Sequence, residues 1–416
     1  MIRAARLCLV LGVGVGVVGG CSGDAPAAPA DAAPPDAKIV SAERPGKRSD
    51  VGGVADPASG LVVLFGGDDG PIVNQIPRPV YLGDTWLFRP GFGWEQAMST
   101  DAPSPRGRHA VALDAVGGRM LLHGGRFRAP MTTGDYTLHG DLWAFDFSTR
   151  AWTALDDGSG TAPEPRYFAA AAFDATAGTF YLHGGGLNRA PLSLRTTNDV
   201  WAYDAAGWRE LSPTGTPPST RLFVAYTHDS RRNRLVVFGG QVGDFVSPGL
   251  SDLYALDLGT LAWTRLHDGG SGAPSGRFSS LMTYDAAGDR YLITGGHADP
   301  GVVNDVWAFS PETGSWTELA VGDRFTGGGL GCLGNPQEIP AEYVEQDLSA
   351  PERRSGGVLS VLGASAWLVG GESDCGDHLD DTWRFDLGTL AWEEILAARS
   401  GESCARRNDA CSCLCL

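Results

Sequence analysis

The chain has 416 residues, enough for two or three average domains or for one large repetitive domain. Its 59 glycines and 26 prolines, with 43% hydrophobic residues, favour many short strands joined by turns over long helices. The formal net charge of −17 argues against sequence-independent binding to nucleic acid and against docking on anionic lipid through a basic face, because both need basic surface.

Residues 1–20 have the pattern of an export signal. Arg3 and Arg6 precede an apolar run over 7–18 that is too short to span a bilayer comfortably. The segment ends in VGGC, which resembles the bacterial lipobox, where a signal peptidase cuts before a cysteine that becomes acylated, here Cys21. The alternatives are an ordinary secretory signal followed by an unrelated cysteine, or an uncleaved anchor.

Residues 21–46 are expected to form a disordered tether rich in proline and alanine. The stretch SGDAPAAPADAAPPDA offers almost nothing to bury, so it should stay extended and flexible. Ser22 rather than aspartate follows the cysteine, which by analogy with enterobacterial sorting favours the outer membrane. The resemblance implies a domain exported from the cytoplasm and held at the cell envelope by lipid alone.

Internal repetition determines the fold predicted for residues 47–397. Six apolar runs end in Gly-Gly; each is followed by a polar loop, by Asp-x-Trp or Asp-x-Tyr, and by a second tryptophan seven to nine residues later. Eleven of the 12 tryptophans lie in this pattern. The doublets begin at Gly66, Gly124, Gly184, Gly239, Gly295 and Gly370, the motif aspartates are Asp84, Asp141, Asp199, Asp252, Asp305 and Asp381, and the second tryptophans are Trp94, Trp152, Trp208, Trp263, Trp316 and Trp392.

An arginine extends the pattern towards the N-terminus of each unit. In the first five copies it lies eighteen residues before the doublet, and an aspartate follows it by eight. In the sixth copy Arg353 lies seventeen residues before Gly370, and no aspartate matches. Each unit is therefore predicted to contain four strands: one after the arginine, a second ending at Gly-Gly, a third around Asp-x-Trp and a fourth around the second tryptophan.

This pattern resembles the kelch repeat over about residues 48–396. The WD-repeat alternative fits less well, because the closing tryptophans are followed by Glu, Thr or Arg rather than Asp. The resemblance implies an all-β, six-bladed β-propeller in which each unit is one four-stranded blade. Six complete units need no blade shared between the termini, although the segment 38–48 is a candidate outer strand near the closure.

Alternating strand directions divide the links between two faces of such a ring. Links between the first and second strands, and between the third and fourth, are short turns on one face. Links between the second and third strands, and between blades, are long and irregular; we call their side the long-loop face and expect binding there. The long links are 68–83, 126–140, 186–198, 241–251 and the insertion 320–352.

The arginines that precede the first strands should ring the central channel on the long-loop face. Converging guanidiniums in an acidic protein predict a ligand carrying a carboxylate, phosphate or sulfate. The alternative is structural, with each arginine tying one blade to its neighbour through loop carbonyls or acids. The candidate ring consists of Arg48, Arg106, Arg166, Arg221, Arg277 and Arg353.

Cysteines and histidines supply further expectations. Export favours disulfides, and a bridge between Cys332 and Cys375 is the first choice, because both should lie on the long-loop face. For the cysteine-rich tail 398–416, partial pairing, a disordered or atypical terminus and a soft-metal site stay open. His123 and His183 directly precede Gly-Gly and should pack between blades. The histidine spacing suits no metal site, and we expect no cofactor.

The leading functional hypothesis is a monomeric, non-catalytic module that binds a protein or glycan on the long-loop face. The alternative is a carbohydrate-active enzyme, since the kelch family includes a periplasmic six-bladed sialic-acid epimerase as well as the copper enzyme galactose oxidase. A third is a structural envelope protein. Nothing in the sequence establishes catalysis, and no catalytic residue is assigned.

Overall fold

The computed structural model describes residues 43–73, 76–190, 195–242, 247–299, 301–325, 344–345, 347–373 and 377–399. These residues form strands and turns without a helix, and hence no helix that could cross a membrane. The predicted signal and most of the tether, the tail from residue 400 onward and all eight cysteines lie outside the described residues. Acylation of Cys21 and the Cys332–Cys375 bridge therefore stay predictions.

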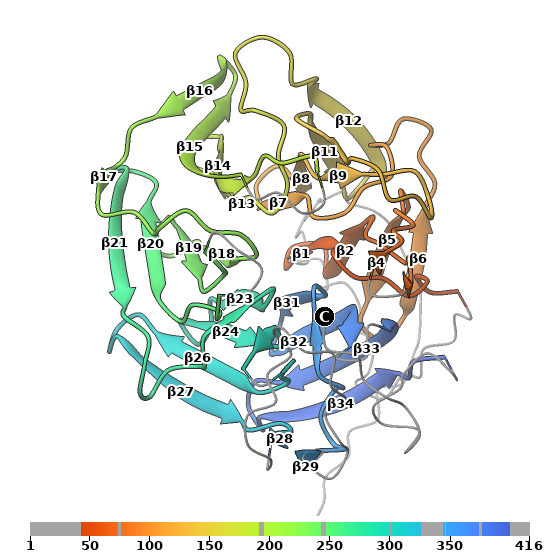
Figure 1. The fold of residues 1–416 in the computed structure, drawn as a ribbon, viewed down its shortest axis with the longest axis vertical. Helices are drawn as coiled ribbons and strands as arrows, with labels where there is room; N and C mark the ends of the chain where they lie inside the picture. The colour runs from red at the N-terminus through yellow and green to blue at the C-terminus, as the bar shows by residue number, and fades with distance from the viewer. Residues whose placement is uncertain are drawn as a thin grey trace, which may run out of the picture.

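Six antiparallel sheets surround a central channel, and each comes from one continuous stretch of chain (Figure 1). The all-β, six-bladed propeller predicted from the repeats is confirmed. The strands of each blade pair in chain order, with the first strand lining the central cavity and the fourth at the rim (Figure 1). The blade strands are β1 (Gly52–Asp56), β2 (Leu61–Phe65), β5 (Thr85–Arg89) and β6 (Gly93–Ala97) in blade 1; β7 (Ala110–Asp114), β8 (Arg119–His123), β11 (Leu142–Asp146) and β12 (Ala151–Asp156) in blade 2; β13 (Ala170–Asp174), β14 (Thr179–Gly186), β15 (Thr196–Asp204) and β16 (Gly207–Leu211) in blade 3; β18 (Ala225–Asp229), β19 (Arg234–Phe238), β20 (Leu253–Asp257) and β21 (Ala262–His267) in blade 4; β23 (Leu281–Asp285), β24 (Arg290–Thr294), β26 (Val306–Ser310) and β27 (Ser315–Ala320) in blade 5; and β31 (Val358–Leu362), β32 (Ser365–Ser373), β33 (His378–Asp386) and β34 (Ala391–Leu396) in blade 6.

Short strands decorate this framework. One of them, β17, runs parallel to β21 and extends blade 4 at its rim, and β30 extends β32. The other short strands pair with one another within the long links. The ten short strands are β3 (Ile72–Val73), β4 (Ile76–Pro77), β9 (Arg126–Phe127), β10 (Thr137–Leu138), β17 (Thr214–Gly215), β22 (Arg277–Phe278), β25 (His297–Ala298), β28 (Arg324–Phe325), β29 (Val344–Glu345) and β30 (Arg354–Ser355).

Six clusters of the hydrophobic core each fill the space between two adjacent blades, and a seventh, of Tyr81, Tyr136, Leu138 and Tyr167, lies among the long links. The cluster between blades 6 and 1 joins Trp367 to Trp94, which closes the ring without sharing a blade between the ends of the chain. Residues 43–48, the described part of the candidate outer strand, form no strand. Arg44 instead pairs with Asp380 of β33 at 3.1 Å and so ties this segment to blade 6.

The Gly-Gly doublet permits adjacent blades to approach closely. Gly66 and Gly67 have φ of 67° and 104°, a region that glycine enters without steric cost. A Cβ on Gly66 would lie 2.5 Å from the carbonyl oxygen of Arg106 in the next blade. The amide of Gly67 donates to that same carbonyl at 3.0 Å. At the closure, Gly371 donates to Arg48 at 2.8 Å, so the last blade meets the first as other neighbours meet.

In four of the six blades, the residue before the Gly-Gly doublet packs against the second tryptophan of the following blade. The ring of Phe65 lies 5.1 Å from Trp152, and Phe238 lies 5.4 Å from Trp316, measured between ring centroids. His123 and His183 occupy the same position, at 5.3 Å from Trp208 and 4.7 Å from Trp263. The prediction that these two histidines pack between blades is confirmed.

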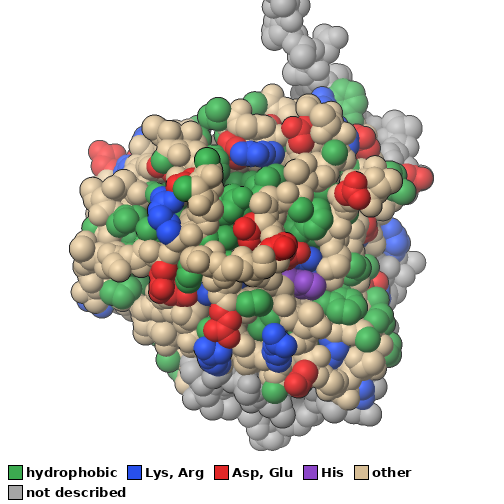
Figure 2. Space-filling view, turned by 90° about the horizontal axis from the view of Figure 1, so that it is seen from above, with side chains coloured by type: hydrophobic (Ala, Val, Ile, Leu, Met, Phe, Trp, Pro, Cys, Tyr) green, Lys and Arg blue, Asp and Glu red, His purple; other side chains and the backbone are tan. Residues whose placement is uncertain are grey.

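The edge of the ring carries charges of both signs. Viewed from the rim near β12 and β16, basic and acidic side chains are scattered among hydrophobic and other groups (Figure 2). A surface of this kind presents no large field of one sign to a partner.

Candidate functional site

The arginine at the start of each blade is held by a repeated set of buried contacts. In blade 1, Arg48 donates from both terminal nitrogens to Asp84, at 2.8 and 2.9 Å, and from Nη1 to the carbonyl of Gly66 at 3.0 Å. Its Nε donates to the carbonyl of Gly46. The indole of Trp86 donates to the same Asp84 carboxylate at 2.6 Å. We call this arrangement the Arg–Asp–Trp lock.

Every blade repeats the lock, with Tyr254 in place of tryptophan in blade 4. There the tyrosine ring lies 5.8 Å from the guanidinium of Arg221. All six arginines are at least nine-tenths buried. The pairs are Arg48–Asp84, Arg106–Asp141, Arg166–Asp199, Arg221–Asp252, Arg277–Asp305 and Arg354–Asp381.

In the sixth blade the structure corrects the predicted residue. Arg354, not Arg353, makes the bidentate pair with Asp381 and donates from Nε to the carbonyl two residues earlier, as its counterparts do. Arg353 lies 3.2 Å from Asp323 instead. The distance along the chain from arginine to doublet is shorter by two residues in this copy, so the spacing of the other five copies pointed to the wrong side chain.

These contacts favour the structural alternative for the predicted arginine ring. Burial alone would raise the pKa of Asp141, but the hydrogen bonds and charge of Arg106 outweigh it and hold that pKa below its ordinary range. None of the six predicted arginines lines the central cavity. An anionic ligand would have to displace an aspartate from each, so ligand binding by these six stays an unsupported prediction. The comparison with the sialic-acid epimerase, which used the same arginines, loses that support too.

A different set of residues surrounds the channel mouth on the long-loop face. Each lies two positions after a lock arginine, has φ between 52° and 64°, and lines the central cavity. Backbone hydrogen bonds connect four of the neighbouring pairs; the amides of Arg108 and Phe168, for example, donate to the carbonyls of Asp50 and Arg108 at 2.8 Å. We call this set the mouth ring: Asp50, Arg108, Phe168, Phe223, Ser279 and Gly356.

The mouth ring was missed at the sequence level, although a constant offset from the arginines would have located it. Its side chains differ from blade to blade. Blades 1 and 2 contribute Asp50 and Arg108, which form an ion pair. The guanidinium of Arg108 also lies over the ring of Phe168, 4.6 Å from its centroid. The mouth is therefore charged on one side and aromatic on the other.

Aromatic rings continue from blade 3 to blade 5. Phe168 contacts Phe223 at 4.5 Å between centroids, Phe223 contacts Phe278 at 5.5 Å, and Phe278 stacks on His297 at 4.8 Å. All four side chains are only partly buried. We call them the aromatic arc. Partly exposed aromatic rings can contact apolar side chains, aromatic groups or the apolar faces of sugars.

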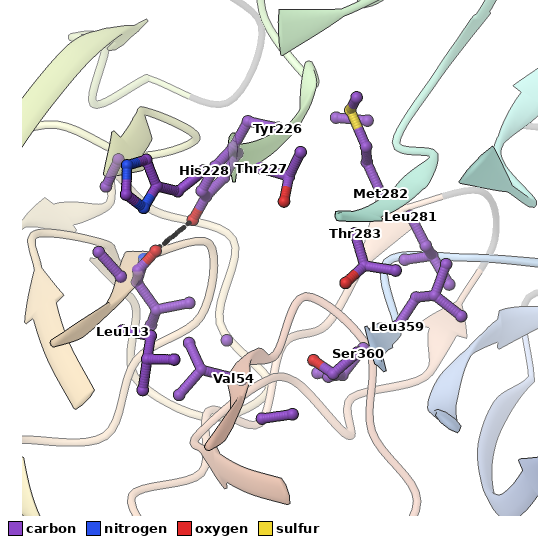
Figure 3. Close-up of a pocket in the computed structure, with 18 of the residues that line it drawn as sticks. Val54, Leu113, Tyr226, Thr227, His228, Leu281, Met282, Thr283, Leu359 and Ser360 are labelled. Carbon is purple, nitrogen blue, oxygen red and sulfur yellow. Dashed lines mark hydrogen bonds between the residues drawn. The ribbon is translucent and has the colours of Figure 1, made fainter. Parts of the chain in front are cut away.

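Behind the mouth lies a cavity of about 430 Å³ formed by the innermost strands (Figure 3). The hydroxyls of Thr227, Thr283 and Ser360 face it from blades 4 to 6, while Val54 and Leu113 give an apolar wall from blades 1 and 2. Its lining carries little charge away from the mouth, so the channel interior offers no general attraction to ions.

Tyr226 crosses this channel from blade 4 to blade 2. Its hydroxyl accepts from the amide of Val111 at 2.9 Å and donates to the carbonyl of the same residue at 3.2 Å (Figure 3). The first strand of the intervening blade 3 begins with three alanines, 170–172, whose small side chains leave room for the phenol ring. Burial raises the pKa of Tyr226 to about 12, so the hydroxyl stays protonated.

The remaining histidines of the long-loop face do not assemble a metal centre. His297 belongs to the aromatic arc, and Nε2 of His378 lies 2.8 Å from the carbonyl oxygen of Gly70. Within the described ranges, no three His, Cys, Asp or Glu side chains gather as a metal ion would require. The cysteine tail, for which a soft-metal site was one alternative, lies outside those ranges.

Comparison with known proteins is consistent with this architecture. The family model described as the KLHDC2/KLHL20/DRC7 Kelch-repeats domain matches residues 37–222 and 177–328. Kelch domain-containing protein 10 of Rattus norvegicus is 30% identical over 196 residues, which cover 45% of this chain and 44% of that protein. Host cell factor homolog hcf-1 of Caenorhabditis elegans is 25% identical over 250 residues, or 56% of this chain and 30% of the relative. The dynein alpha chain of the Chlamydomonas reinhardtii flagellar outer arm is 28% identical over 189 residues, 41% of this chain but 4% of that one. The match thus spans less than half the length of each relative.

Proposed function

The chain belongs to the kelch-repeat family, and from that premise we propose that it is a non-catalytic interaction module that binds a protein partner at the mouth ring and aromatic arc. The observation that carries this proposal is the arc itself. Four partly exposed rings from three blades form a continuous surface on a rigid scaffold, which suits binding better than mobile side chains would, because little conformational entropy is lost.

The backbone of the mouth ring gives independent support. Only Gly356 occupies its positive-φ position without steric cost, whereas bulky residues such as Phe168 and Phe223 adopt it at a penalty of about 1–3 kcal/mol each. Glycine would adopt this backbone conformation without that penalty. Side chains retained at a cost are expected where they contact a partner.

The proposal is tested by selecting binding peptides from a random displayed library against the immobilised domain. Binding should be lost in a Phe168→Ala/Phe223→Ala variant. The matched control is Val116→Ala, since Val116 is 82% exposed on the turn between β7 and β8, on the opposite face. Peptides that bind the double variant as tightly as the original domain would contradict an interaction site at the mouth. Selective binding to a glycan array, abolished by the same double variant, would redirect the proposal to a sugar ligand.

We also propose that the module is displayed from the cell envelope through lipid on Cys21. Support comes from the order of features along the sequence: basic start, apolar run, VGGC and a proline- and alanine-rich tether with little to bury. A Cys21→Ser variant should lose incorporation of an alkyne-labelled fatty acid and move from the detergent phase to the aqueous phase. Unchanged partitioning of that variant would argue against acylation.

A further inference from the structure

Arg126 is enclosed by tyrosines at the edge of the mouth. It begins the β9–β10 hairpin of blade 2 and is only 8% exposed. Its guanidinium carbon lies 3.9 Å from the ring centroid of Tyr136 and 5.2 Å from that of Tyr167. Its Nε donates to the hydroxyl of Tyr81 at 2.9 Å. Three tyrosines from blades 1, 2 and 3 therefore fix the plane of one cation.

This arginine differs from seven other buried arginines in its ionic partners. The six lock arginines and Arg353 each pair with an aspartate. Within the described part of the chain, Arg126 has no carboxylate at ion-pair distance, and its hydrogen bond to Tyr81 is the only one that its side chain donates. Removing a guanidinium from water without a counterion is costly, and π faces offset only part of that cost.

Arg108 brings a second cation towards the same tyrosine. Burial raises the pKa of Tyr81 to about 12, and the positive charges of Arg126 and Arg108 both act against that rise. Arg108 rests on Phe168, the first ring of the aromatic arc. The unused N–H edge of Arg126 thus belongs to a sector where positive charge adjoins exposed rings, in a chain whose net charge is −17.

We propose that the terminal N–H groups of Arg126 bind a carboxylate side chain of an acidic peptide segment in the partner protein. The inference rests on the proposed interaction function and assigns chemistry to one part of its surface. A planar guanidinium held by three rings presents two parallel donors, which match a carboxylate in bidentate geometry. Apolar or aromatic neighbours of the acidic residue would then lie on the aromatic arc.

The test uses peptides selected on the original domain, each paired with a copy in which Asp or Glu is replaced by Asn or Gln. Binding is measured by fluorescence polarisation to the original domain and to Arg126→Gln and Arg126→Lys. Arg265→Gln is the charge-matched control, because Arg265 lies on the outer strand β21 with a side chain 53% exposed. We expect the amide exchange and Arg126→Gln each to weaken binding by at least tenfold, with no further loss when they are combined.

The possible outcomes distinguish the carboxylate subsite at Arg126 from the proposed interaction function. Peptides that need the aromatic arc but bind equally well as amides, or to Arg126→Gln, would overturn the carboxylate subsite and leave the interaction function standing. Peptides indifferent to the Phe168→Ala/Phe223→Ala variant would overturn the function itself. If Arg126→Gln fails to fold, the amide exchange on the original domain still decides. If a sialylated glycan binds in a way that depends on Arg126, and no peptide of this kind is selected, the ligand is not an acidic peptide.

Discussion

The Arg–Asp–Trp locks and the mouth ring lie two residues apart in every blade, and they use the repeat in opposite ways. The locks keep one chemistry six times, with the guanidinium buried and paired each time. The mouth ring keeps one backbone conformation six times but changes its side chain from acid to base, phenyl, hydroxyl and hydrogen. What the repeat holds constant forms the scaffold, and what it varies on that scaffold is available for recognition.

Breaking a lock should have the largest effect on stability. An Arg106→Leu variant leaves Asp141 in a largely buried site without its counterion, which should cost about 3 kcal/mol of unfolding free energy. Denaturant unfolding followed by tryptophan fluorescence measures the loss. A double variant, Arg106→Leu/Asp141→Leu, should recover part of it, because no charge is then left unpaired. Equal stability of the single and double variants would show that the pair does not act as a unit.

The two histidines that pack between blades, His123 and His183, should make the stability of the fold sensitive to acid. Burial lowers the pKa of His123 to about 3 and that of His183 to about 4, against about 6.5 in the unfolded chain. The folded state therefore holds both neutral, and their contribution is fully present above pH 6.5 and lost as pH falls below it. Lowering the pH from 7 to 5 should therefore reduce the free energy of unfolding by about 2 kcal/mol for each histidine.

A His123→Phe/His183→Phe variant checks this, since Phe65 and Phe238 fill the same position in other blades. Its melting temperature should fall less between pH 7 and pH 5 than that of the original protein. The same fall in both would mean that other groups control acid unfolding. Peptide binding at pH 7 should be unaffected, because these residues lie between blades.

The bond across the channel should have an intermediate effect. Tyr226→Phe removes the hydroxyl that serves both the amide and the carbonyl of Val111, and should cost about 1 kcal/mol. Urea titration at neutral pH gives the difference, with Tyr203→Phe as a control for another tyrosine hydroxyl bonded to a carbonyl, that of Leu155. A loss of several kcal/mol would indicate that Tyr226 belongs with the locks as part of the scaffold.

The mouth ring should give the smallest change in stability. Phe223→Gly loses the contacts of a partly exposed ring but relieves a positive-φ strain, so the two effects should nearly cancel, to within about 1 kcal/mol. The same variant should bind selected peptides at least tenfold more weakly. A large loss of stability without a loss of binding would reverse the distinction between scaffold and mouth.

The repeat determined most of the fold, because its signals are local. Gly-Gly, Asp-x-Trp and the second tryptophan each specify a strand end or a packed ring within about sixty residues, and six copies specify six blades and the identity of the two faces. The same reasoning misassigned Arg353, since the sixth copy departs from the common spacing, and it could not separate a free arginine ring from a paired one. That choice depends on Asp84 and its equivalents, which lie 27–36 residues further along the chain.

Only the closed ring decided what the mouth contains. Phe168, Phe223 and Phe278 are more than fifty residues apart in sequence. They touch because the closed ring brings the channel ends of successive blades side by side. Arg126 reaches Tyr81, Tyr136 and Tyr167 for the same reason. Sequence patterns with a period of one blade record what each blade needs in order to fold. Contacts between blades at the channel mouth depend on the geometry of the whole circle, which no single repeat encodes.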